Sequence, residues 1–226
     1  MTLNITLLNV SETFKMQEAK LAISLGSFCT TSYLLKEFGY KQVSYPFDWI
    51  FSSLSMVEHC LVDNFTEFLQ RLYYDKGNEK DNTYHWFYQS FVFPKNPKHS
   101  TIFAHRNLLN DIDYAYYERC VERFRNIISN DQVCKVFIVT YVWNIDTRKD
   151  QDILSFHSFL TSQVTNFILV IIDCQKLNSA ETITREEIRP SLIQYQLHVT
   201  SKNNGKYFED MTDNLNYQRI LQENLN

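Results

Sequence analysis

The sequence of 226 residues has little glycine and little proline, with four of each. That scarcity excludes a collagen-like chain and a glycine- and proline-rich low-complexity chain. Hydrophobic residues make up 44% of the sequence and charged residues 21%, which suits a buried core and excludes wholesale disorder. The length fits one domain better than two, so we expect a single α/β domain over residues 1–226.

Positive charge and long apolar runs are also lacking. The 22 Lys and Arg residues are outnumbered by 26 Asp and Glu residues, for a net charge of −4. This balance offers no general electrostatic surface for nucleic acid, so we expect no nucleic-acid partner. The longest apolar runs, around 136–142 and 167–172, are too short to span a bilayer. The first residues do not have the pattern of a signal peptide, so we expect a cytoplasmic protein.

The five cysteines are widely spaced and form no Cys-x-x-Cys pair: Cys29, Cys60, Cys120, Cys134 and Cys174. This spacing predicts neither a structural zinc site nor a disulfide framework, and it suits a reducing compartment. The six histidines show no metal-ligand spacing either. We therefore expect no metal and no resident cofactor.

Aromatic residues are abundant, at 15% of the chain. Most of them are expected to pack in the core. They are densest within residues 74–104, which we interpret as an aromatic-rich insertion that could cap a site.

Apolar runs and helical spacing alternate along the chain. Strands are expected at 21–25, 135–143, 167–174 and 192–200, and helices at 30–38, 54–72, 113–128, 152–163 and 214–225, with a loop and short helix leading to 188. This order predicts a doubly wound, Rossmann-like α/β fold. Its mostly parallel sheet has at least four strands and helices on both faces. Ligands of such sheets bind at the carboxyl ends of the strands. Those ends are Gly26–Cys29, Trp143–Asn144 and Asp173–Cys174.

The most reactive candidate in these segments is Cys29, which ends the sequence GSFC between a predicted strand and a predicted helix. A helix N-terminus lowers a thiol pKa, and its N–H groups can bind an oxyanion. Gly26 would form the turn, and Ser27 could cap the helix or contact a ligand. The alternative is that Cys29 is a small packed residue.

Three further features could supply chemistry. Asp48 lies between aromatic residues in PFDW, where desolvation would suit an acid or base; it could equally cap the following helix. Trp49, the next residue, is a candidate substrate-binding residue. His105 follows a short apolar run and suits a general base, or is a surface residue. Arg119 and Arg123, one helical turn apart, could clamp a phosphate or carboxylate, or form a solvated face with their glutamate neighbours.

Residues 23–50, ISLGSFCTTSYLLKEFGYKQVSYPFDWI, resemble the opening of a bacterial and viral domain family of unknown function. That family bears the label of papain-like cysteine peptidases. Its opening is a strand, Leu-Gly-Ser-x-Cys, a helix and Pro-Phe-Asp-Trp. The resemblance implies Cys29 as nucleophile, His105 as base and Asp48 as the group that orients the histidine. The family has an aspartate after its histidine where this chain has Arg106.

Two enzyme functions and one binding function remain open at this point. The first is a metal-free cysteine hydrolase acting on a peptide or other acyl substrate through Cys29, His105 and Asp48. The second is a metal-independent glycosyltransferase or other carbohydrate-modifying enzyme. It would bind a nucleotide sugar at Gly26–Cys29 and Arg119 or Arg123, with Asp48 or His105 as base. The third is a non-catalytic binding module.

Overall fold

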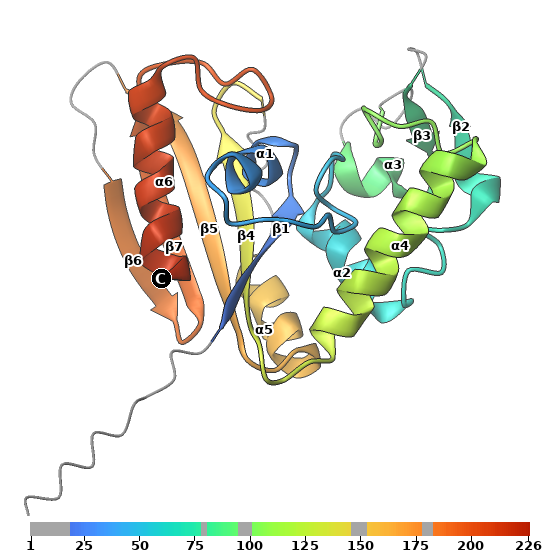
Figure 1. Ribbon diagram of the computed structural model, residues 1–226, viewed down its shortest axis with the longest axis horizontal. Helices are drawn as coiled ribbons and strands as arrows, with labels where there is room; N and C mark the ends of the chain where they lie inside the picture. Colours follow the sequence, from blue (N-terminus) through green and yellow to red (C-terminus); the bar gives the residue numbers. More distant parts are fainter. Residues whose placement is uncertain (1–18, 78–80, 95–100, 146–152, 178–182) are drawn as a thin grey trace, which may run out of the picture.

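The computed structural model describes residues 19–77, 81–94, 101–145, 153–177 and 183–226. Its larger sheet has five strands in the order β1-β4-β5-β7-β6 (Figure 1). These are β1 (Lys20–Gly26), β4 (Cys134–Val142), β5 (Phe167–Lys176), β7 (Leu192–Val199) and β6 (Ile183–Arg189). The first four are parallel, and β6 pairs antiparallel with β7. An α/β fold with a mostly parallel sheet is therefore confirmed.

Helices cover both faces of this sheet. One face packs against α1 (Thr30–Glu37) and α6 (Met211–Leu225). The other packs against α2 (Leu54–Val62), α4 (Asp111–Ile128) and α5 (Ile153–Gln163). Alternate residues of β4 divide between the two cores, with Val136 and Ile138 in one and Phe137 and Val139 in the other. This alternation explains why the strands have continuous apolar sequences.

The doubly wound order is not confirmed. In a doubly wound sheet the chain starts in the middle and reverses direction. Here β1, β4, β5 and β7 follow one another across the sheet in sequence order. The loop and short helix expected before residue 188 are also wrong in part, because residues 183–189 form β6. This strand is mostly exposed and lacks an apolar run, and its pairing with β7 decides its structure.

A second group of elements lies between α1 and β4 in the sequence, on the right of Figure 1. Besides α2 and α4 it contains the 3-10 turn Arg71–Tyr73, the strands β2 (Tyr74–Lys76) and β3 (Thr83–His85), and α3 (Trp86–Val92). The helix expected over 54–72 ends at Val62. Beyond it Asn64 and Phe65 have positive φ, and the Asp63 carboxylate accepts hydrogen bonds from the backbone N–H groups of Phe65 and Glu67.

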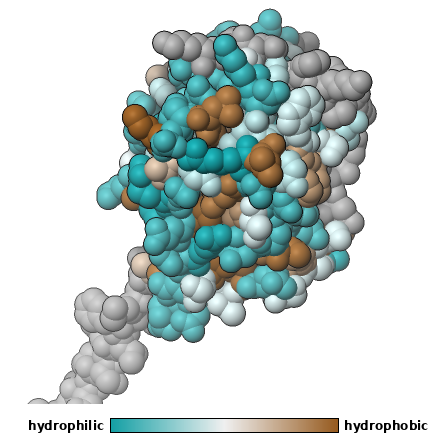
Figure 2. Space-filling model, turned by 90° about the vertical axis from the view of Figure 1, so that its right-hand side faces the viewer, coloured by the Kyte–Doolittle hydropathy of each residue, from teal (hydrophilic) through white to brown (hydrophobic). Residues whose placement is uncertain are grey.

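The aromatic residues of 74–104 pack into the shared core more than they cap a site. Within the described part of this range, Tyr74, Tyr88 and Phe103 are buried and contact Phe68 or each other. Figure 2 views the side of α4, β2 and β3 and shows separate hydrophobic patches on a mainly hydrophilic surface.

No described helix has the length and apolarity needed to cross a membrane.

Candidate functional site

Cys29 lies where β1 turns into α1. It is the N-cap residue of α1, and its backbone carbonyl accepts a hydrogen bond from Tyr33 N at 2.9 Å. Its side chain is 6% exposed and does not cap the helix. Ser27 is not the N-cap residue of α1, and its hydroxyl donates to the Thr140 carbonyl on β4 at 3.0 Å. The local sequence thus places the thiol at the carboxyl edge of the sheet, as predicted.

The turn before Cys29 depends on a close approach between Gly26 and Ser52. Gly26 has φ of +108°, and a Cβ added to it would lie 1.7 Å from Ser52 Oγ. Ser52 is fixed there, since its hydroxyl donates to the Leu25 carbonyl at 2.8 Å and its N–H donates to the Ser27 carbonyl at 3.0 Å. Only glycine fits this position, both for its backbone angle and for its lack of a side chain.

Polar side chains hold the start of α1 against the edge of the sheet. Thr31 Oγ1 donates to Thr140 Oγ1 at 2.7 Å, and Thr140 Oγ1 is 2.7 Å from the Tyr217 hydroxyl on α6. Thr30 Oγ1 donates to Asn203 Oδ1 at 2.9 Å. The Asn203 Nδ2 group is buried without a hydrogen-bond partner in the described structure. A fixed, unused donor therefore lies next to the first residue of α1.

Asn144 is the second predicted carboxyl-end residue that reaches this site. Its Nδ2 donates to the Asn203 carbonyl at 2.9 Å, and its Oδ1 accepts from Asn203 N at 3.2 Å. These two bonds join the end of β4 to the loop that follows β7. By contrast, Cys174 is fully buried in the core between the sheet and α6.

Asp48 forms a buried ion pair with Lys41. The side chains are 0% and 4% exposed, and Asp48 Oδ2 also accepts from Tyr45 N at 2.6 Å. Lys41 Nζ donates in addition to the Ser32 hydroxyl on α1. Burial raises the Asp48 pKa and lowers the Lys41 pKa, in each case against the opposing charge of the partner. The second carboxylate oxygen, Asp48 Oδ1, is buried and has no hydrogen-bond partner in the described structure.

The other predicted residues lie farther out. His105 is exposed, two residues after Phe103, whose backbone bridges to Ile50. Arg119 is exposed, whereas Arg123 is half-buried and donates to the Ser44 carbonyl at 3.0 Å and to Cys120 Sγ at 3.1 Å. The first of these bonds of Arg123 holds the segment before Asp48.

Residues 20–176 match the family described as "Putative papain-like cysteine peptidase (DUF1796)". The chain belongs to this family. No curated protein and no solved structure matched the chain. The matched range contains Cys29, Asp48 and His105, and it ends with β5.

The thiol of this family member is not activated in the described structure. Burial raises the pKa of Cys29 to about 11; the nearby positive charge of Lys206 opposes the rise and the negative charge of Asp48 adds to it. The thiol is therefore protonated near neutral pH. A hydrolase built on it must remove the proton during attack rather than before it.

Alkylation of Cys29 by iodoacetamide should reflect this raised pKa. At pH 7 a pKa of about 11 instead of 9.0 leaves about a hundredfold less thiolate. We expect the labelling rate to rise about tenfold per pH unit up to about pH 10, and Lys206→Gln to slow it further. Labelling quantified on the Cys29 peptide by mass spectrometry measures both. A rate that levels off below pH 8 would contradict the expectation.

Several residues around the thiol were not predicted from the sequence. Lys41 precedes Asp48 by seven residues with no motif to mark it, and Asn203 and Lys206 lie in an irregular loop. Asn203 follows the predicted strand 192–200, so the rule that indicated Asn144 could have found it. Tyr117 on α4 lies within electrostatic range of Cys29, and burial raises its pKa well above the usual value.

A second cysteine and histidine also meet, away from this site. The Cys60 thiol donates to the Tyr88 hydroxyl at 3.3 Å, and His59 Nδ1 lies 3.1 Å from the same oxygen. Cys60 is fully buried, and burial raises its pKa well above the usual value. We interpret this group as polar packing inside an aromatic cluster. Among the described residues no cluster of three metal-ligating side chains occurs.

Proposed function

We propose that this protein is a cysteine hydrolase with Cys29 as its nucleophile. The position of the thiol carries the proposal: Cys29 joins β1 to α1 at the carboxyl edge of a parallel sheet, where α/β proteins bind ligands. The first N–H groups of a helix have no intrahelical acceptor and can stabilise an oxyanion. Membership of a family described by cysteine peptidase chemistry supports the same reaction class.

In the proposed reaction, Cys29 Sγ forms a bond to the acyl carbon as its proton passes to His105. The leaving group departs with that proton, and water then hydrolyses the thioester, releasing the acid and restoring the thiol. The His105 segment is tied to that of Asp48 by the Ile50–Phe103 bridge and by the hydrogen bond from Phe51 N to the Ile102 carbonyl at 2.9 Å. The unpartnered Asp48 Oδ1 is the acceptor we assign to the imidazole N–H when His105 turns inward.

Turnover of p-nitrophenyl acetate tests this proposal. We expect Cys29→Ala to lower the rate at least about a thousandfold, since the nucleophile is lost. His105→Ala should lower it by about a hundredfold or more, since the base is lost. Mass spectrometry should find an acetyl group on Cys29 of the unmodified protein.

Cys134→Ala is the matched control for this experiment. Cys134 is also 6% exposed, but it begins β4 at the opposite edge of the sheet. Turnover should therefore be unchanged in that variant. Equal turnover by Cys29→Ala and the unmodified protein would overturn the proposal.

No observation favours the nucleotide-sugar alternative. It needs Arg119 or Arg123 at the phosphates, whereas Arg119 is exposed and the described donors of Arg123 contact Ser44 and Cys120. Stabilisation of the protein by a nucleotide sugar in a thermal-shift experiment, together with normal stability and turnover of Cys29→Ala, would reverse this choice.

A further inference from the structure

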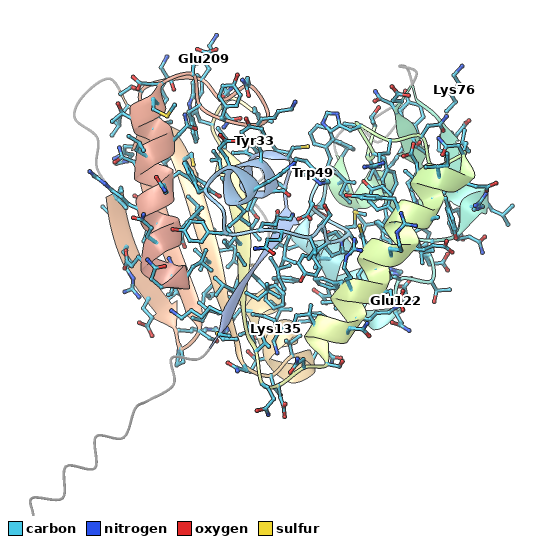
Figure 3. All side chains as sticks on the ribbon, viewed as in Figure 1. Tyr33, Trp49, Lys76, Glu122, Lys135 and Glu209 are labelled. Carbon is cyan, nitrogen blue, oxygen red and sulfur yellow. The ribbon has the colours of Figure 1, made fainter. Side chains whose placement is uncertain are left out.

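A pocket of about 350 Å³ lies beside the C-terminal half of α1. Its walls come from α1, from residues 41–49, from the segment just before α4 and from the first half of α4. The lining residues that matter here are Lys36, Lys41, Ser44, Trp49, Arg106 and Tyr116. In Figure 3, Trp49 lies between α1 and the elements of the second group. None of the predicted functions used this pocket, although Trp49 was a predicted binding residue.

The lining of this pocket is cationic and contains no acidic residue. Lys41 is paired with Asp48 behind the wall, and Arg106 is paired with Asp113 at 2.7 Å. Lys36, which is exposed, adds a third positive charge. Asp48 and Asp113 offset much of the charge of Lys41 and Arg106, so Lys36 supplies most of the net positive charge of the pocket. Arg106 bonds Asp113 through one of its nitrogens, and a guanidinium has further N–H donors for an anion.

Two of the three cations are held in place against aromatic rings. The Arg106 guanidinium lies 3.7 Å from the centroid of the Tyr116 ring, and Lys41 Nζ lies 5.7 Å from that of Trp49. Trp49 is itself oriented by a hydrogen bond from Nε1 to the Ser44 hydroxyl at 3.3 Å. A preorganised guanidinium loses less entropy on binding a carboxylate or phosphate, and the indole offers a flat apolar wall beside it.

The pocket and the thiol lie along one face of α1. Cys29, Ser32 and Lys36 follow one another at helical spacing, and Ser32 contacts Lys41. At 1.5 Å per residue, Lys36 lies about 10 Å along the helix axis from Cys29. An extended acyl chain bound at Cys29 could therefore place a distal group in the pocket.

We propose that this pocket is an anion subsite that holds a carboxylate or phosphate of the substrate, with Lys36, Lys41 and Arg106 as ligands and Trp49 as the apolar wall. The role in substrate selection rests on the proposed hydrolase function. The binding of the anion does not rest on it.

Binding is tested in the Cys29→Ala protein, where no acylation can occur. The probes are inorganic phosphate and succinate, titrated at constant ionic strength and followed by NMR of the Trp49 indole. We expect saturable shifts, and at least about fivefold weaker binding after Lys36→Gln or Arg106→Gln, because each removes a charge-assisted hydrogen bond. Lys76→Gln, which removes an exposed charge outside the pocket, should bind as before.

Selectivity is tested with p-nitrophenyl monosuberate and p-nitrophenyl octanoate, which have equal chain length and differ in a terminal carboxylate. We expect kcat/KM to favour the acid at least about fivefold, Lys36→Gln to abolish that preference by lowering kcat/KM for the acid, and Lys76→Gln to retain it. No saturable anion shift, or equal binding by Lys36→Gln, would overturn the subsite. Anion binding that follows the variants, with no Cys29-dependent turnover, would overturn the hydrolase and support the subsite.

Discussion

Replacement of Asp48 by asparagine is expected to destabilise the protein by about 3–5 kcal/mol, because it leaves a buried charge without its partner. The amide oxygen of the new side chain can still accept the hydrogen bond from Tyr45 N, so the turn keeps that contact. Lys41, however, would keep its buried position with no counter-charge. It must then either remain charged or lose its proton on folding, and both cost free energy. Urea unfolding measures the difference.

The double variant Lys41→Met, Asp48→Asn separates the charge effect from packing. It removes the buried charge while Met fills most of the lysine volume, so we expect it to recover most of the lost stability. Asp111→Asn is the control, because Asp111 pairs with Arg71 on the surface and is 89% exposed. That variant should unfold as the unmodified protein does. A double variant no more stable than Asp48→Asn would contradict the explanation.

The pH dependence of the Asp48→Asn variant has a definite sign. Burial already lowers the Lys41 pKa below 10.5, and loss of the neighbouring carboxylate lowers it further. Between the folded-state pKa and 10.5, the unfolded chain binds more protons at this position than the folded protein. Stability therefore rises with pH in that window. We expect the deficit of Asp48→Asn relative to the unmodified protein to shrink as the pH approaches 10.5.

The sheet could be predicted from the sequence because its strands are buried on both faces. Four parallel strands have β-rich apolar sequences, and each was predicted to within a few residues, including β4 at Cys134–Val142. The edge strand β6 could not be found in this way. Its sequence, ITREEIR, is polar because the strand is mostly exposed, and pairing with β7 alone defines it.

The site could be predicted only in part, for a related reason. Cys29 and Asp48 lie in local motifs, and Asp48 comes close enough for its charge to raise the thiol pKa. Lys41 and Asn203 become neighbours of these motifs only through the fold, since Asn203 lies 173 residues after Thr30, its hydrogen-bond partner. The protonated state of Cys29 was also unpredictable, because the helix N-terminus favours a thiolate while burial, invisible in the sequence, opposes it more strongly.

Replacement of Gly26 by alanine is expected to cost about 3 kcal/mol or more in stability and to impair Cys29 chemistry. Two penalties combine at this position. The φ of +108° is strained for any residue with a Cβ, and the added Cβ would overlap Ser52 Oγ at 1.7 Å. Ser52 cannot easily move, since it is bonded to the Leu25 and Ser27 carbonyls. The turn that positions Cys29 must therefore shift, and a displacement of about 1 Å is enough to slow attack about a hundredfold.

Gly39→Ala separates the two penalties. Gly39 also has a positive φ, +80°, but a Cβ there would meet no atom within 4 Å. We expect it to cost only the backbone strain, about 1–2 kcal/mol, and to leave acylation of Cys29 unchanged. Adding Ser52→Gly to Gly26→Ala should remove the overlap and recover part of the difference between the two single variants; the rest is the cost of losing the buried hydrogen bond from Ser52 to the Leu25 carbonyl. If Gly26→Ala proves no less stable than Gly39→Ala by urea unfolding, and is acylated as fast, the close contact with Ser52 does not shape the site.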